Sequence, residues 1–496
     1  MERSEEYIKN ERKQDWRVAL QKKIKAKDRM SIERALMAET APEVRIKSQR
    51  IEVNTGLTKE QALTEASRCM DCVNPTCMEG CPVSINIPKF IKHIECDEIL
   101  EAASVLKETS ALPAVCGRVC PQELQCEQKC FYVTKLNQPA VAIGFLERFA
   151  ADFERESGHV STPEMVTENG IKVAVIGSGP SGLSFAGDMA KLGYDVTVFE
   201  ALHEIGGVLK YGIPEFRLPN AVVDVEIESL RRMGVKFITN YIVGQTASIA
   251  DLKADGYKAF YVGSGAGLPR FMNIPGENAN GILSSNEYLT RVNLMGADSE
   301  ESDTPVLRGK NVVVVGGGNT AMDSVRTAKR LGAERAMIVY RRSEEEMPAR
   351  VEEVHHAKQE GIEFLTLTNP IEYIANEDGR VSQMKVQKME LGEPDDSGRR
   401  RPVPVEGSEY ILDCEVVVVA VGVSPNPLIP NSVEGLDVSK WGTIEVVKDK
   451  MQSSIPEMFA GGDIVRGGAT VILAMGDGRK AAKNMDIYLT EKYLSN

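Results

Sequence analysis

The segment IKVAVIGSGPSG, residues 171–182, decides the fold of the middle of this chain. An apolar run of strand character leads into a glycine turn, a helical pattern follows to about residue 192, and a second strand at residues 194–199 ends at Glu200. This order of strand, turn, helix, strand and acid is typical of a βαβ unit that binds a dinucleotide. A glycine turn that binds nothing is the alternative. The turn residues expected at the nucleotide are Gly177, Gly179, Pro180, Ser181 and Gly182.

The glycines of this turn have separate roles. Gly177 permits a tight turn, Gly179 lets the backbone approach a pyrophosphate, and Gly182 lets helix and strand pack closely. The helix that begins near Ser181 offers unpaired N–H groups to the phosphates, and Glu200 can accept hydrogen bonds from ribose hydroxyls. We interpret this first copy as the FAD site.

The same order repeats in residues 311–340, with a second turn that reads GGGNTA. Arg341 and Arg342 stand where the first copy has Glu200. A carboxylate there would repel a 2′-phosphate, whereas guanidinium groups bind it in forked geometry. The second nucleotide is therefore predicted to be NADPH, and the alternative is that both arginines merely end a strand. The candidate residues are Gly316, Gly318, Asn319, Thr320, Ala321, Arg341 and Arg342.

A further apolar strand at residues 416–421 leads to the segment FAGGD, residues 459–463, and the chain closes with a helix. A last strand and helix can return to complete the first fold, so we expect an α/β protein whose NADPH domain is inserted in its FAD domain.

Eight of the ten cysteines lie in two clusters ahead of these turns. The first is Cys69-x2-Cys72-x4-Cys77-x3-Cys81-Pro and the second is Cys116-x3-Cys120-Pro-x5-Cys126-x3-Cys130. Such tight spacing, ending in Cys-Pro, is typical of iron-sulfur ligation. Structural zinc is a weaker alternative because only the first two cysteines have knuckle spacing. Disulfides need an oxidising compartment, and the N-terminus has no apolar leader segment to direct the chain there.

Composition narrows the function classes. With 496 residues, 42% hydrophobic content and a net charge of −13, the chain describes a globular protein of several domains and argues against a nucleic-acid partner. No apolar run approaches the ~18 residues that span a bilayer, so we expect no membrane association and a cytoplasmic location. Residues 1–50 hold 14 Lys and Arg against 9 Asp and Glu. Such a basic arm could dock an acidic partner protein, although a solvated helical surface is the commoner meaning.

The expected chemistry is conversion of electron pairs to single electrons. NADPH gives a hydride, a flavin releases electrons singly, and a cluster accepts one at a time. No acid or base is compulsory for this, so no catalytic side chain is predicted, and the five histidines are interpreted as structural or surface residues.

The expected organisation begins with a capping box at Thr58–Gln61 that opens a helix into Cys69. The expected parts are a charged helical arm (1–55), a helical domain with two iron-sulfur clusters (56–150), a linker (151–170), a first part of the FAD domain (171–285), the NADPH domain (286–415) and a second part of the FAD domain (416–496).

Together these motifs resemble the small (β) subunit of NADPH-dependent glutamate synthase over nearly the whole chain. The strings that carry the resemblance are the two cysteine runs, the turns at 177–182 and 316–323, GGVLKYGIPEFRLP at 206–219, GAGLPR at 265–270, YRR at 340–342 and AGGD at 460–463. The N-terminal half of dihydropyrimidine dehydrogenase and the large subunit of NADH-dependent ferredoxin:NADP oxidoreductase look similar.

The resemblance implies a glutathione-reductase-like pair of Rossmann-like domains and further site residues. Glu200, Gly207 and Arg217 would hold FAD, Gly462 and Asp463 would meet its ribityl-phosphate region, and Thr470 would lie near the flavin ring. The residues that would line the NADPH site are Gly318, Asn319, Thr320, Arg341 and Arg342.

The resemblance also implies a crossed set of ligands for two [4Fe-4S] clusters. Cys69, Cys72, Cys77 and Cys130 would hold one cluster, and Cys81, Cys120, Cys126 and Glu147 the other, with Cys116 spare. Counting thiolates gives the alternative that all eight cysteines are ligands. Glu147 would then be an exposed helical residue.

The function implied is an NADPH-oxidising flavoprotein that feeds electrons through FAD and two clusters to a partner subunit. In this family the partner is the glutamate synthase large subunit, which makes glutamate from glutamine and 2-oxoglutarate. The alternatives are an oxidoreductase that serves ferredoxin or another acceptor, and a scaffold subunit that binds cofactors without turning over NADPH.

Overall fold

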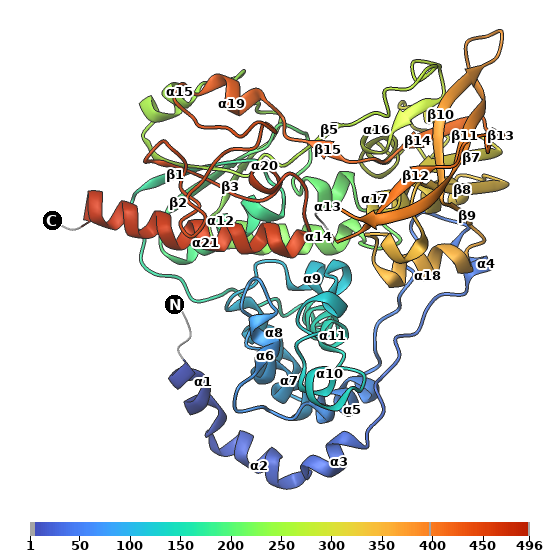
Figure 1. The fold of residues 1–496 in the computed structure, drawn as a ribbon. Helices are drawn as coiled ribbons and strands as arrows, with labels where there is room; N and C mark the ends of the chain where they lie inside the picture. Colours follow the sequence, from blue (N-terminus) through green and yellow to red (C-terminus); the bar gives the residue numbers. More distant parts are fainter. Residues whose placement is uncertain (1–4, 396–397, 495–496) are drawn as a thin grey trace.

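The computed structural model describes residues 5–395 and 398–494 (Figure 1). An N-terminal helical region, drawn in blue to cyan, lies below two α/β halves, drawn in green to red. Among the described residues, no helix is both long and apolar enough to cross a membrane.

The N-terminal region is built from short helices. α7 (Ile87–Glu95) shows why they pack: its buried Ile87, Phe90, Ile91 and Ile94 recur at helical spacing on one face. α5 (Lys59–Arg68) begins at a capping box made by Thr58 and Gln61, which confirms that expectation. The other helices are α1 (Glu5–Arg12), α2 (Asp15–Lys23), α3 (Ala26–Met30), α4 (Pro42–Arg45), α6 (Thr76–Glu79), α8 (Ile99–Lys107), α9 (Pro113–Val119), η1 (Gln122–Leu124), α10 (Phe131–Leu136) and α11 (Ile143–Ser157).

A parallel sheet in the order β16-β4-β1-β2-β3 forms the first half. Its strands are β1 (Lys172–Ile176), β2 (Asp195–Phe199), β3 (Lys236–Ile238), β4 (Tyr257–Val262) and β16 (Met458–Ala460). α12 (Pro180–Lys191) and α21 (Val471–Leu489) pack on one another, and α21 and α14 (Asn220–Arg232) lie between this sheet and the helical region (Figure 1). Shorter helices are α13 (Val208–Tyr211), α15 (Ile249–Ala254), α19 (Leu428–Ser432), α20 (Asp463–Arg466) and the π-turn η4 (Thr490–Leu494).

The second half repeats the plan with a parallel sheet in the order β6-β14-β7-β8-β9. Its elements are β6 (Ile282–Ser284), α16 (Ser285–Leu289), η2 (Thr290–Leu294), β7 (Asn311–Val315), α17 (Asn319–Arg330), β8 (Arg335–Tyr340), η3 (Glu344–Glu346), α18 (Val351–Gln359), β9 (Glu363–Thr366) and β14 (Val416–Val419). A separate antiparallel sheet belongs to the same half and is formed by β10 (Thr368–Ala375), β11 (Val381–Pro394), β12 (Arg400–Pro404) and β13 (Tyr410–Asp413). β5 (Leu268–Pro269) and β15 (Val423–Ser424) pair where the chain passes between the halves.

The expected insertion of one half in the other is confirmed, since β16 pairs with β4 of the first sheet after the second half is complete. Three expected boundaries are wrong. β6 and β14 both belong to the second sheet, so that half extends at least over residues 282–419 rather than 286–415. The apolar run after residue 416 had suggested a return to the first sheet, yet it pairs with β7 first. The linker expected from residue 151 starts later because α11 continues to Ser157.

Candidate nucleotide and cluster sites

The backbone of the first turn needs its glycines. Gly177 has φ +101°, and a Cβ on it would lie 2.6 Å from the carbonyl oxygen of Gly263. A Cβ on Gly182 would lie 2.0 Å from the carbonyl oxygen of Gly177, so helix and strand could not close there. Gly179, by contrast, faces open space with no atom within 4 Å. That open side, at the N-terminus of α12, fits a bound pyrophosphate.

Glu200, which follows the last residue of β2, is hydrogen-bonded to this turn. Its carboxylate is buried and accepts hydrogen bonds from the N–H and the Oγ of Ser178, at 2.9 and 2.6 Å, and from the N–H of Leu202 at 2.9 Å. Ser178 Oγ in turn accepts from the N–H of Gly206 at 3.0 Å. The candidate ribose acceptor is therefore held in one position beside the turn.

Two further glycines predicted for the FAD site meet the same turn. A Cβ on Gly207, at φ +54°, would lie 2.9 Å from Cα of Gly179, and a Cβ on Gly462, at φ +76°, would lie 2.9 Å from Cβ of Ser181. Only glycine lets these segments approach so closely.

Asp463 and Thr470 stand at the N-termini of two consecutive helices of the first half. Asp463 begins α20 and accepts from the N–H of Ala469 at 3.0 Å. Thr470 caps α21 through a hydrogen bond from the N–H of Leu473. Burial, then the charges of Asp463 and Glu200, raise the pKa of Tyr211 to about 12.

Arg217, which the resemblance assigns to FAD, forms ion pairs within the chain. Its side chain is 7% exposed, its Nη1 donates to both oxygens of Asp323 at 2.7 Å, and its Nε pairs with Glu353 at 3.1 Å. Both partners belong to the second half. Arg217 therefore joins the two halves through its ion pairs, and its assignment to FAD stays a prediction.

The second turn repeats the backbone plan of the first. Gly316 has φ +142°, and a Cβ on it would lie 2.4 Å from the carbonyl oxygen of Ala420. Gly318 again faces nearly open space at the start of α17, where Thr320 and the buried Ala321 follow. Asn319 Oδ1 accepts from the N–H of Arg350 at 2.9 Å, so the turn is tied to the segment that precedes α18.

The two arginines after β8 differ in burial and in their contacts. Arg342 is 5% exposed, pairs with Asp395 at 2.6 Å and donates to the carbonyl of Arg400 at 2.8 Å. Arg341 is exposed, and the described part of the structure gives it no ion pair. Arg341 thus presents its guanidinium to solvent, and its assignment to a 2′-phosphate stays a prediction, whereas Arg342 anchors the β11–β12 hairpin.

The cysteines gather in two groups. A small apolar pocket brings together the first, whose members come from both sequence runs: Cys69, Cys72, Cys77 and Cys130. Burial, then the thiols of Cys69 and Cys130, raise the pKa of Cys77. Across the described residues, no three side chains of the metal-ligating types converge on a point that could hold one ion. A zinc ion requires such convergence, whereas a cluster offers each thiolate a separate iron.

The second group contains Cys81, Cys116, Cys120, Cys126 and Glu147. Glu147 is 6% exposed, so its interpretation as an exposed helical residue is wrong, and its Oε1 has no hydrogen-bond partner among the described residues. Burial, then Glu226, raises the pKa of Glu147 to about 8. A buried, unpartnered carboxyl among thiols fits a ligand of an iron cluster. Cys116 lies beside Cys120 in this group.

The second group lies against the first half. Cys116 Sγ is 3.5 Å from Met475 Sδ in α21, and a Cβ on Gly476 would lie 2.9 Å from the carbonyl oxygen of Pro82. Both residues of α21 follow Thr470, the cap of that helix.

The sequence missed one connection between the sites. Arg350, which is tied to Asn319, also donates to Gln122 Oε1 at 3.3 Å, and Gln122 Nε2 donates to the carbonyl of Cys116 at 3.2 Å. Arg350 and Gln122 are 228 residues apart, and no local pattern signals such a contact.

Comparisons with known proteins match both regions. A family model described as dihydropyrimidine dehydrogenase domain II, 4Fe-4S cluster, matches residues 45–159, and the pyridine nucleotide-disulphide oxidoreductase model matches residues 171–478. The glutamate synthase [NADPH] small chain of Escherichia coli (strain K12) is 39% identical over 87% of this chain and 92% of its own length. The NADP(+)-dependent formate dehydrogenase subunit beta of Moorella thermoacetica is 38% identical over 84% of this chain and 60% of its own.

Solved structures support the same fold. FprA from Mycobacterium tuberculosis, in complex with NADPH, aligns with a TM-score of 0.55 and 21% identity over 66% of this chain and 86% of its own. This likeness confirms the fold of two nucleotide-binding halves.

Proposed function

Because the chain belongs to the family of the NADPH-dependent glutamate synthase small chains and their relatives, we propose that it oxidises NADPH and passes the electrons through FAD and two [4Fe-4S] clusters to a partner protein. The chain is an NADPH-dependent FAD and iron-sulfur oxidoreductase. We assign FAD to the first turn and NADPH to the second. The partner is the glutamate synthase large subunit, and we place the protein in the cytoplasm.

The observation that carries this function is the contact of α21 with the second cysteine group. FAD takes up two electrons together and gives them up singly, and each cluster takes one at a time. The 3.5 Å contact of Met475 with Cys116 puts the second group beside the half that would hold FAD. This order of parts supports a path on which electrons pass from the half assigned to FAD to the second cysteine group, and from there to the first cysteine group.

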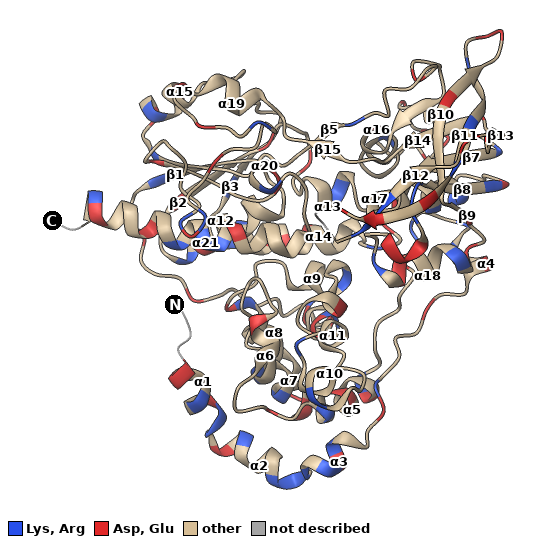
Figure 2. Cartoon of the chain, in the orientation of Figure 1, with Lys and Arg blue, Asp and Glu red and all other residues tan. Residues whose placement is uncertain are grey.

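The exit of this path would lie at the loop that follows Cys72. Val73 in this loop is 56% exposed, and the preceding Asp71 is held by Arg17 and Gln21 of α2. α1 to α3 wrap around the end of the helical region that is farthest from the α/β halves, and Figure 2 shows Lys and Arg along them. A partner subunit with an acidic face would fit this end.

One observation favours a second candidate partner. The relative from Moorella thermoacetica is the β subunit of a formate dehydrogenase and is nearly as similar as the glutamate synthase chain. The electron acceptor of this chain could therefore be another redox subunit, with the same NADPH and FAD chemistry.

A turnover assay tests the core of the proposal. The purified chain, with flavin and iron quantified, should reduce an artificial dye with NADPH in the absence of any partner. A scaffold subunit would bind the cofactors and leave the dye oxidised. Co-purification of the chain with the glutamate synthase large subunit, or with a different redox subunit, decides between the partners.

The ligands of the second cluster are tested by two substitutions. We expect Glu147→Ala to perturb one cluster and Cys116→Ser to keep both, because we assign the carboxylate as the fourth ligand and Cys116 as spare. Iron content and EPR of the reduced protein measure the outcome. The opposite pattern would show that all eight cysteines are ligands.

A further inference from the structure

Residues 39–54, which we call the strap, leave the other N-terminal helices and run to the outer side of the second half. The strap includes α4, which lies beside α18 and β9, far from α1 to α3 and α5 (Figure 1).

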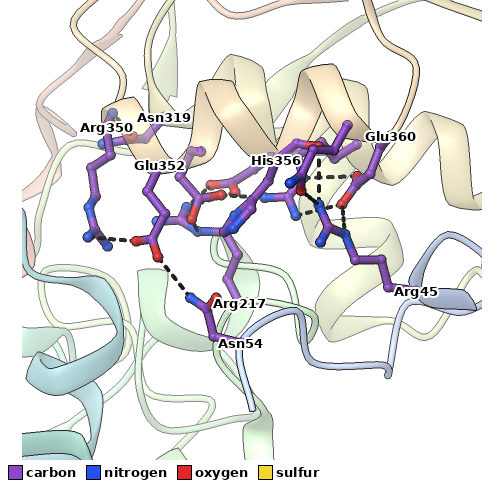
Figure 3. A network of polar contacts seen from close by, with 12 residues as sticks. Arg45, Asn54, Arg217, Asn319, Arg350, Glu352, His356 and Glu360 are labelled. Atoms are coloured by element: carbon purple, nitrogen blue, oxygen red, sulfur yellow. Dashed lines mark hydrogen bonds and ion pairs between the residues drawn. The ribbon is translucent and has the colours of Figure 1, made fainter. Parts of the chain in front are cut away.

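The centre of the strap is a fully buried arginine. Arg45 is 0% exposed, and it donates from Nε to Glu360 Oε1 at 2.8 Å and from Nη2 to Gln359 Oε1 at 2.6 Å (Figure 3). Its Nη1 pairs with Glu39 of the strap itself at 3.2 Å. The contact with Glu360 spans 315 residues of sequence.

Glu360, which follows the last residue of α18, forms ion pairs with three guanidinium groups. Besides Arg45, Arg326 and Arg330 of α17 pair with it at 2.9 and 2.7 Å, and these arginines are all 0% exposed. Against the effect of burial, Arg326 and Arg330 hold the pKa of Glu360 well below its usual value. The carboxylate is therefore ionised and shared between the strap and the second half.

The network continues into the first half through Phe216 and Arg217. The guanidinium groups of Arg326 and Arg330 lie 4.7 and 3.9 Å from the ring centroid of Phe216. The strap also contacts the first half directly, because the N–H of Val53 donates a hydrogen bond to the carbonyl of Phe216 at 3.0 Å. Arg217, the next residue, pairs with Asp323 of α17, five positions after Gly318 of the second turn.

The strap also binds the helical region. Glu52 pairs with Arg118 at 2.9 Å and with Arg148 at 2.8 Å, on α9 and α11. Three parts of the molecule therefore meet on one segment of sixteen residues, numbers 39–54.

Buried ion pairs of this kind contribute little net stability, because desolvation of the charges offsets their attraction. They fix one geometry, however, since breaking a pair leaves a buried charge uncompensated. A network that joins the two halves is therefore suited to setting their relative orientation.

We propose that the strap holds the second half in the orientation in which NADPH meets the flavin, with Arg45 as a positioning residue. This inference rests on the proposed function, because it concerns the transfer from NADPH to FAD. Arg45 touches neither turn, so its loss should change the rate of transfer more than the binding of nucleotide.

The test compares two arginines of the strap. Arg45→Met removes one of the three buried arginine partners of Glu360. The matched control Arg50→Met removes a side chain that is 66% exposed and whose ion pairs with described residues are long, at 3.6 and 3.9 Å. The wild type and both variants are compared by flavin and iron content, NADP+ affinity and the rate of flavin reduction at saturating NADPH. Hydrogen exchange of residues 39–54 and α18 reports on the strap without turnover.

We expect Arg45→Met to slow flavin reduction by at least about tenfold, with NADP+ affinity within about threefold of the wild type, because a displacement of about 1 Å can cost a factor of 100 in rate. Exchange of the strap should rise, and Arg50→Met should match the wild type in every measurement. Faster exchange of the strap with an unchanged rate of flavin reduction would overturn the proposal.

A milder variant covers the case in which Arg45→Met does not fold. Gln49→Ala removes only the hydrogen bond from Gln49 Nε2 to the carbonyl of Thr327, 3.1 Å away on α17. It should give a smaller loss in the same rate, and no loss would again overturn the proposal. A wild-type protein whose flavin is not reduced by NADPH would instead refute the proposed function itself.

Discussion

At the first turn, Gly177 takes a left-handed conformation against the carbonyl of Gly263, and at the second, Gly316 does the same against the carbonyl of Ala420. The residues that follow these glycines differ. Ser178 donates its hydroxyl to Glu200, whereas Gly317 lies under the ring of Tyr340, where a Cβ would be 2.7 Å from the nearest ring atom.

The ends of the neighbouring strands differ accordingly. In the first half, the buried carboxylate of Glu200 accepts a hydrogen bond from the turn. In the second half, the ring of Tyr340 lies against the turn at the equivalent strand end, and two arginines follow it in the sequence. We infer from the comparison that the glycines supply a common phosphate scaffold, while the residues at the strand end select the nucleotide. The predictions below test this division.

The largest effect is expected from Glu200→Ala. The substitution removes the candidate acceptor for the ribose and, with it, the internal hydrogen bonds that hold the turn. Loss of one hydrogen bond from the ribose to a carboxylate costs about 1.5 to 3 kcal/mol, so FAD affinity should fall by about 10- to 100-fold. Flavin and iron per chain are measured after gel filtration. Glu204→Ala, at an exposed carboxylate nearby, is the control. Loss of iron with flavin retained would contradict the separation of the two sites.

The second prediction separates Arg341 from Arg342. Arg341→Ala should lower the preference for NADPH over NADH by about tenfold, or about 1.4 kcal/mol, because a charge-assisted contact to the 2′-phosphate is lost. Arg342→Ala should lower it by less than about threefold, since Asp395 already holds that guanidinium. The two coenzymes are compared by kcat/KM, with Arg335→Ala at the exposed start of β8 as the control. The reverse result would mean that the phosphate displaces Asp395.

The smallest effect is expected from Gly317→Ala. The added methyl group forces the buried ring of Tyr340 to shift, so NADP+ affinity should fall by about threefold while flavin content stays constant. Gly267→Ala, where a Cβ meets no atom within 4 Å, is the control. If NADP+ affinity is unchanged in Gly317→Ala, the ring does not determine the shape of the second site.

Local patterns predicted much of this fold. The glycine turns, the capping box at Thr58 and the insertion of one half in the other follow from short sequence signals. The neighbouring strands β6 and β14 were misplaced because apolar strands look alike whichever sheet they join.

The candidate sites were predictable to a lesser degree. The first cysteine group unites members of both runs as the resemblance implied, but Arg217 could not be placed, because only the fold brings Asp323 and Glu353 to it. The strap was unpredictable for the same reason, since its charges find partners about 300 residues away.

The pairing of β16 with β4 has a consequence for the order in which the protein is made. Between these strands the ribosome must add roughly 200 residues, which at about 5 to 20 residues per second takes about 10 to 40 seconds. During that time the edge of the first sheet at β4 is unpaired, while the inserted half has all its strands and can fold. The half that we assign to FAD would thus be the last to close, after its own final strand and α21 have left the ribosome.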